Sequence, residues 1–203
     1  MSKLRNLMAV TVLSGLSALG FAQSGRDVAL YPWTFTDGNK TSRQMVVLTA
    51  KRIAENQGLH VIAQDTAYGK FDSLRPKISL DKDLPAEPDL ARFARAVHAG
   101  NLIFGHVSWH TRSKWVGTGP KTISSAKVDV YVFNLKEGKV TYSKEGIEAR
   151  SDEKESTLKD VAAILFTPII PMISGGPATP REQRAVQIAL GKALLDWTKM
   201  INR

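Results

Sequence analysis

Apolar and polar positions along the chain predict a sheet whose centre lies in its middle third. Residues 100–107 are an apolar segment that begins at Gly100 and is interrupted by Gly105, which predicts a buried strand. Residues 128–135 alternate valines with polar or aromatic side chains, and a glycine turn follows at 136–138. This pattern predicts one arm of a hairpin. We therefore expect these two segments to form the middle of the sheet.

Helical spacing of apolar residues predicts three main helices. The first carries a Thr41–Gln44 capping box and ends at Gly58. The second covers 89–99, with Gly100 as its C-cap. The last begins at Pro180, directly after a capping threonine, and keeps an apolar stripe to residue 201. Shorter helices are expected at 66–73 and from about residue 157.

The remaining segments complete a mixed order of strands and helices. Strands are expected at 27–35, 59–63, 101–109, 122–135 and 139–149. A strand, a helix and a strand within 27–63 make a crossover unit, so these two strands should be parallel. The order β-α-β-α-β-β-β-α predicts an α/β (α+β) fold, with a mixed, roughly five-stranded sheet and helices packed on it.

The polar segment 110–121 is expected to be a loop before the hairpin. Within it Arg112, Lys114 and Lys121 lie near the exposed-looking Trp115. Basic residues beside an aromatic ring can bind a sugar polymer, a lipid headgroup or nucleic acid. We therefore consider the loop, counted broadly as 110–127, a possible contact for a partner or a polyanion. The simpler alternative is a hairpin connection without a ligand.

The most apolar stretch outside the N-terminus is 164–173, which two prolines prevent from forming one helix. If exposed, it would mark a partner or membrane contact, and if buried, it would belong to the core. The side chains expected to make the contact are Phe166, Ile169, Ile170, Met172 and Ile173.

The histidines offer the only candidate catalytic groups. On one straight strand His106 and His110 would point to the same face, with Ser108 between them. Together with Asp129 they could serve a hydrolase. A metal site needs three or four converging ligands, however, and no cluster completes this one. The segment 117–122 resembles a phosphate loop, but Pro120 removes a needed donor and no helix follows. We assign no catalytic residue, metal or cofactor.

The N-terminus predicts export. Lys3 and Arg5 precede an apolar run, and a small-residue cleavage site ends at Ala22. We expect a signal peptide at 1–22, a single domain at 23–203 and no membrane span in the mature chain. The alternative is a retained anchor. The net charge of +9 falls to +7 without Lys3 and Arg5, and it would attract anionic envelope polymers. The chain has no Cys, which excludes disulfides and N-terminal lipidation.

Three patterns together resemble a family of exported α/β domains. They are the first strand at 28–33, the glycine-flanked strand at 99–107 and the hairpin turn at 134–138. The chain is similar here to the TolB amino-terminal domain, to CsgG and to LpoB-type activators of penicillin-binding proteins. It departs from them at Asn134, where an Asp is usual, and in lacking the lipidated Cys and the apolar pore hairpins.

The resemblance implies a non-catalytic protein of the bacterial envelope, periplasmic or secreted, that acts through protein contacts. An envelope protein or a second copy of the chain is the expected partner. Two alternatives stay open: binding of an anionic polymer or glycan by the 110–127 segment, and the hydrolase of His106 and His110. Export makes nucleic acid an unexpected partner.

Overall fold

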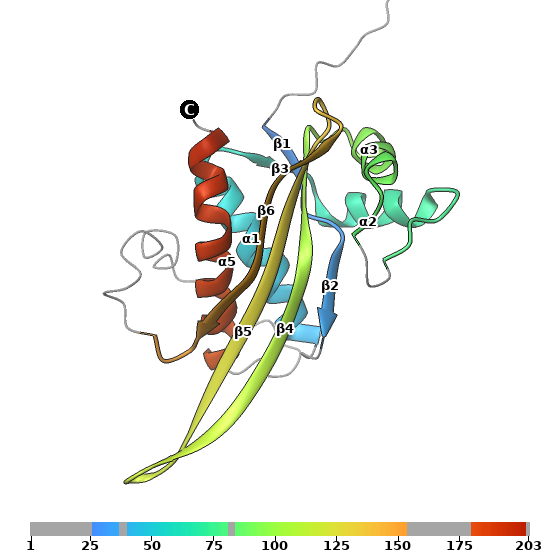
Figure 1. Ribbon diagram of the computed structural model, residues 1–203. Coiled ribbons are helices and arrows are strands. Elements are labelled where there is room, and N and C mark those ends of the chain that lie inside the picture. The colour runs from blue at the N-terminus through green and yellow to red at the C-terminus, as the bar shows by residue number, and fades with distance from the viewer. Residues whose placement is uncertain (1–25, 37–39, 81–83, 154–179, 202–203) are drawn as a thin grey trace, which may run out of the picture.

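A computed structural model describes residues 26–36, 40–80, 84–153 and 180–201. Within them a mixed sheet of six strands packs with four helices (Figure 1). The strands are β1 (Asp27–Ala29), β2 (Trp33–Thr36), β3 (His60–Val61), β4 (Asn101–Val116), β5 (Gly119–Asn134) and β6 (Lys139–Arg150). The helices are α1 (Lys40–Asn56), α2 (Gln64–Ser73), α3 (Glu87–Ala96) and α5 (Pro180–Ile201). The predicted α/β class is confirmed.

The sheet runs in the order β3-β1-β4-β5-β6, and β2 pairs with β4 beside β1. β1 is parallel to both β3 and β4, as the crossover pattern predicts. β4, β5 and β6 are antiparallel to one another. The sixth strand arises because the predicted strand 27–35 is divided into β1 and β2 around Pro32. Proline has no N–H to donate to a strand neighbour, which explains the division there.

Helix ends differ from the prediction at two caps. α1 begins at Lys40, so Thr41 lies inside the first turn and is not the N-cap. α3 ends at Ala96, and the residue in the left-handed conformation is His98, with φ of 57°, rather than Gly100. A non-glycine residue can hold this conformation at the end of a helix, although glycine is commoner. α5 begins at Pro180 as predicted.

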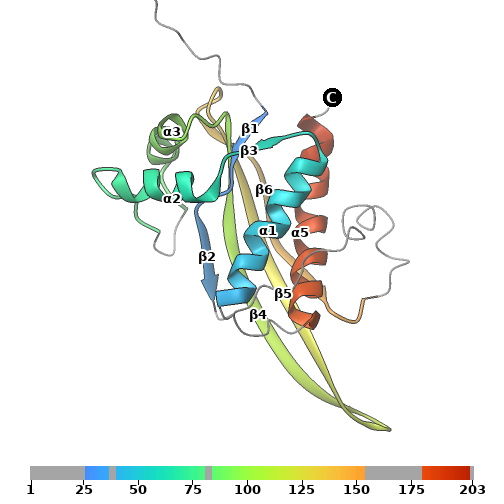
Figure 2. The same ribbon diagram turned by 180° about the vertical axis from the view of Figure 1, so that it is seen from behind.

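The helices cover the two faces of the sheet unequally. α1 and α5 lie side by side along one face (Figure 2). Under them lies a core that includes Ile103, Val107 and Trp109 of β4. α2 and α3 cover the other face only where β4 begins, and there Leu102 and Phe104 join their core. This division follows from the alternation of side chains along a strand.

The most prominent departure from prediction is the length of the β4–β5 hairpin. The two strands pair from Asn101 and Asn134 to Val116 and Gly119, around a turn at 117–118. β2 reaches only Ser108, and β6 only Ser125. Residues 110–123 therefore form a two-stranded extension, which we call the distal ribbon, with no further strand beside it among the described residues. The predicted polar loop is wrong, because polar residues here lie in strands that face solvent.

Candidate binding face of the sheet

One face of β4 and β5 continues past α2 and α3 without a described helix over it, and we call it the open face. Antiparallel register places facing residues of the two strands side by side on it. These pairs, in order toward the turn, are His106 and Asp129, Ser108 and Lys127, His110 and Ser125, Arg112 and Ile123, and Lys114 and Lys121. The sequence therefore concentrates ionisable groups on a surface that water can reach.

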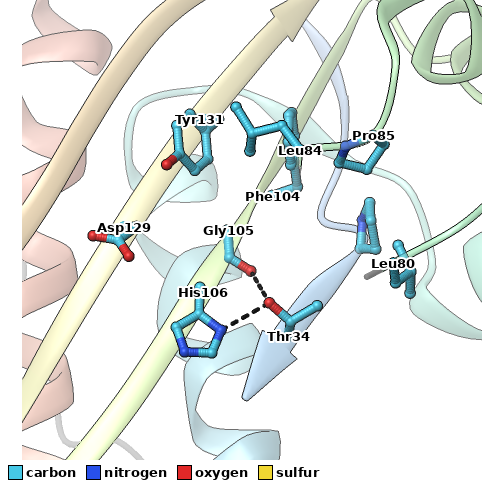
Figure 3. Close-up of a pocket in the computed structure, with 10 residues that line it drawn as sticks. Thr34, Leu80, Leu84, Pro85, Phe104, Gly105, His106, Asp129 and Tyr131 are labelled. Atoms are coloured by element: carbon cyan, nitrogen blue, oxygen red, sulfur yellow. Dashed lines mark hydrogen bonds between the residues drawn. The ribbon is translucent and has the colours of Figure 1, made fainter. Parts of the chain in front are cut away.

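A first hollow of about 530 Å³ lies where the open face meets the segment that follows α2 (Figure 3). Its apolar side is formed by Pro32, Leu80, Leu84, Pro85 and Phe104, and its polar side by Thr34, His106, Asp129 and Tyr131. Leu84 is 49% exposed at this position. The hollow thus offers an apolar wall beside hydrogen-bonding groups, which is typical of a recognition site.

His106 is held by β2. Its Nδ1 lies 2.9 Å from the Thr34 hydroxyl, and its Nε2 lies 3.0 Å from the Thr36 hydroxyl. The Asp129 carboxylate lies on the facing strand and accepts the Gly146 N–H at 2.6 Å. A general base needs a ring nitrogen that can reach its substrate. In this arrangement both nitrogens of His106 serve the β2–β4 contact instead.

The structure also shows where His110 and Ser108, the other residues of the predicted hydrolase site, lie. His110 lies on the same face as His106 and Ser108, as predicted. Its side chain is exposed. Among the described residues no three His, Asp or Glu side chains lie together closely enough to hold a metal.

Tyr131 closes one side of the first hollow. Its hydroxyl donates to the Glu145 carboxylate at 2.9 Å. Burial, together with this bond and the negative charges of Glu145 and Asp129, raises the pKa of Tyr131 to about 12. The phenol is therefore neutral at physiological pH, and it fixes the position of Glu145 rather than acting as a base.

A second hollow of about 490 Å³ continues along the open face toward the turn. Its lining includes four cationic side chains and one carboxylate, with Ile123, Ser108, His110 and Ser125 between them. The charged residues are Arg112, Lys114, Lys127, Arg150 and Glu148. Arg150 lies outside the predicted 110–127 contact segment, and Lys127, at the end of that segment, is not among its named contacts, because only the pairing of β4, β5 and β6 brings both beside Arg112.

Positive charge is compensated only in part along the distal ribbon. Lys114 faces Lys121 directly, and like charges in this position are destabilising. Asp152 lies 3.9 Å from Lys121 and 3.0 Å from Arg150. Between Asp89 and Asp129 the sequence contains no acidic residue. The ribbon therefore carries a positive field toward its end.

The sequence-predicted contact residues have different places. Arg112, Lys114 and Lys121 share the open face of the distal ribbon, whereas Trp115 lies on its opposite face and is 72% exposed. The predicted apolar contacts at 164–173 and the predicted signal peptide at 1–22 lie outside the described residues. No helix among the described residues is long and apolar enough to cross a membrane.

No family model and no curated protein matches the chain. Solved structures similar to it include lipoprotein GNA1162 from Neisseria meningitidis, with a TM-score of 0.43 and 7% identity over 68% of this chain and 92% of that one. They also include the LpoB C-terminal domain from Salmonella enterica, with a TM-score of 0.38 and 15% identity over 60% and 81% of the two chains. A third is the hypothetical protein CT253 from Chlamydia trachomatis, with a TM-score of 0.36 and 17% identity over 61% and 71%.

These neighbours include an LpoB-type domain, one of the three groups that the sequence resembles. The likeness to TolB and CsgG stays a prediction.

Proposed function

We propose that this protein is an exported, non-catalytic binding domain of the bacterial envelope that acts through protein contacts at the open face. The chain would be processed after Ala22 and work as a single domain from residue 23. The observation that supports this function is the open face itself. A sheet face that α1 and α5 leave free carries two adjoining hollows of about 530 and 490 Å³.

The composition of the open face favours a protein partner for the first hollow. Leu84, Pro85 and Phe104 form an apolar patch beside Asp129 and Tyr131. Protein interfaces commonly combine an apolar centre with a polar rim that fixes orientation. The engagement of His106 with β2 favours binding over catalysis at this position.

Site-specific cross-linking in the native host tests the proposal. A photoreactive residue at Leu80, in the first hollow, should give a discrete adduct, whereas one at Glu55, on α1, should not. Leu84→Lys should abolish the adduct, while Met200→Lys, at a side chain of similar exposure (53% against 49%), should keep it. Equal adducts from both positions, or an adduct indifferent to Leu84→Lys, would refute the assignment.

The same adduct distinguishes the partner classes. Its mass equals that of two chains if the partner is a second copy, and differs if it is another envelope protein. Export is checked separately, since the protein from the periplasmic or extracellular fraction should begin at Gln23. A chain that stays in the cytoplasm with an intact N-terminus would contradict the predicted location.

The second hollow favours a second candidate function, the binding of an anionic envelope polymer. Lys127 and Arg150 line it together with Arg112 and Lys114, and such a groove can follow a chain of carboxylates or phosphates. Retention on an anionic resin should then be salt-sensitive and should fall in the triple variant Arg112→Ala/Lys114→Ala/Lys121→Ala. Unchanged retention of that variant would eliminate this candidate. Because the protein is expected to be exported, nucleic acid is not proposed as the polymer.

A further inference from the structure

The end of the distal ribbon presents a single large aromatic side chain. Trp115 faces Pro120 across the ribbon and is 72% exposed. The other three tryptophans, Trp33, Trp109 and Trp197, are only 6%, 7% and 2% exposed. The chain thus buries its indoles with one exception, Trp115, which lies beside the turn of the β4–β5 hairpin. Figures 1 and 2 show this end of the hairpin projecting away from the helices.

Two lysines flank this tryptophan. Lys114 and Lys121 are the neighbours of Trp115 and Pro120 in sequence, and they face each other across the ribbon. Successive residues of a strand are about 3.3 Å apart along it and point to opposite faces. The ribbon end therefore carries an indole on one face and two lysines on the other, and the Lys121 ammonium also lies 3.9 Å from the Asp152 carboxylate. Arg112 lies two residues farther back.

We propose that the end of the distal ribbon docks on the surface of an anionic phospholipid bilayer. Trp115 enters the headgroup region, where indole rings are favoured because one part is apolar and the N–H can hydrogen-bond. Lys114 places its ammonium group on lipid phosphates, and Lys121 adds positive charge that Asp152, 3.9 Å away, offsets in part. The contact lies at the membrane surface, and it is independent of the protein contact proposed for the open face.

The arrangement fits a bilayer better than a polymer strand. A polymer that follows the second hollow touches the cationic face, and Trp115 points to the opposite face. A planar surface that meets the end of the ribbon touches both faces together. Lysines on unpaired strands also discourage edge-to-edge association. That role accounts for Lys114 and Lys121, but it gives no reason for an exposed tryptophan between them and the turn.

Vesicle flotation tests the docking directly. The chain beginning at Gln23, the predicted exported form, is mixed with vesicles of three parts phosphatidylcholine to one part phosphatidylglycerol, or of phosphatidylcholine alone. It should float with the first, much less with the second, and detach as salt rises. Equal flotation with both, or with neither, overturns the proposal.

Fluorescence identifies the contacting residue. Because the other indoles are buried, iodide should quench mainly Trp115, and anionic vesicles should suppress this quenching and shift the emission to shorter wavelength. Trp115→Ala should lose flotation, whereas Met200→Ala, which removes another exposed apolar side chain (53%), should keep it. If Trp115 stays open to iodide on the vesicles, or Trp115→Ala floats as the parent does, the ribbon end does not dock.

The two lysines are tested against a control variant that loses the same number of positive charges. Each basic residue near an anionic surface contributes about fivefold in affinity. Because Asp152 offsets part of the charge of Lys121, Lys114→Ala/Lys121→Ala should weaken vesicle binding by about fivefold to thirtyfold. Lys51→Ala/Lys139→Ala removes two lysines that are 48% and 60% exposed elsewhere, and should weaken it far less. Equal losses in the two variants would assign the effect to overall charge. The site would belong to a free polymer if soluble polyphosphate displaced the protein from vesicles and the Trp115→Ala variant still bound polyphosphate. Either this result or equal losses in the two lysine variants would overturn the proposal.

Discussion

Replacing Gly105 by alanine tests how closely β4 and β5 approach beside the first hollow. A Cβ at this position would lie 2.0 Å from the carbonyl oxygen of Asp129 and 3.1 Å from the Trp33 ring. Real Cβ atoms essentially never come within 3.0 Å of another heavy atom in this way. The obstacle is backbone rather than a flexible side chain, so the strands must separate locally.

The cost follows from two terms. Forcing an extra carbon into a packed interior typically costs about 1–3 kcal/mol, and each strand hydrogen bond weakened by the separation adds about 1 kcal/mol. We expect Gly105→Ala to lower the free energy of unfolding by about 2–4 kcal/mol. At about 2–4 °C per kcal/mol for a chain of this size, the melting temperature should fall by roughly 5–15 °C.

The same substitution in α2 provides a matched control. A Cβ added to Gly69 would meet nothing within 4 Å, and this glycine lies inside a helix, where alanine is favoured over glycine by roughly 0.5–1 kcal/mol. Urea unfolding followed by tryptophan fluorescence should therefore shift in opposite directions for Gly105→Ala and Gly69→Ala. A Gly105→Ala protein as stable as the parent would refute the close approach of the strands.

Two further predictions concern pH. Partial burial raises the pKa values of Tyr31, Tyr131 and Tyr142 from 10.0 to about 12. The unfolded chain therefore loses these protons first, and stability should fall between about pH 10 and pH 12. Urea titrations should show a shallower fall in Tyr142→Phe. Separately, the Lys144 ammonium bonds the Asp196 carboxylate and lowers its pKa. The pair is partly exposed, so Lys144→Ala should cost about 0.2–1 kcal/mol at pH 7. Because Asp196 loses this contribution as it is protonated, the difference from the parent should narrow below about pH 4, and a constant difference would contradict the pairing.

The sequence predicts the core strands because apolar residues mark their buried faces, which are one face along most of β5 and both faces where β4 begins. Val128, Val130 and Val132 alternate with less apolar neighbours, and all three are fully buried in β5. This alternation cannot identify strands beyond His110, because both faces of the distal ribbon meet water and no apolar alternation remains there. The signals that could have identified the ribbon are its threonines, Ile123 and Trp115, which suit strands, on both sides of the Gly117–Thr118 turn.

The candidate site is harder to predict, because it depends on pairing between distant segments. Arg112, Lys114 and Lys121 were found from their proximity in sequence. Lys127 and Arg150 join them only through the registers of β4 with β5 and of β5 with β6. The bonds from His106 to β2 depend likewise on parallel pairing across some seventy residues.

Register connects the fold to both proposed contacts. A slip of one residue between β4 and β5 would change every facing pair, so Lys114 would no longer face Lys121. Gly105 opposes this slip, because the close approach at Asp129 admits only a residue without a side chain. At the other end of the hairpin, the turn fixes the same register by pairing Val116 with Gly119. If Gly105→Ala loosens the strands beside the hollow, the turn alone must hold the ribbon. Partner contact at the open face should then weaken more than vesicle docking by Trp115.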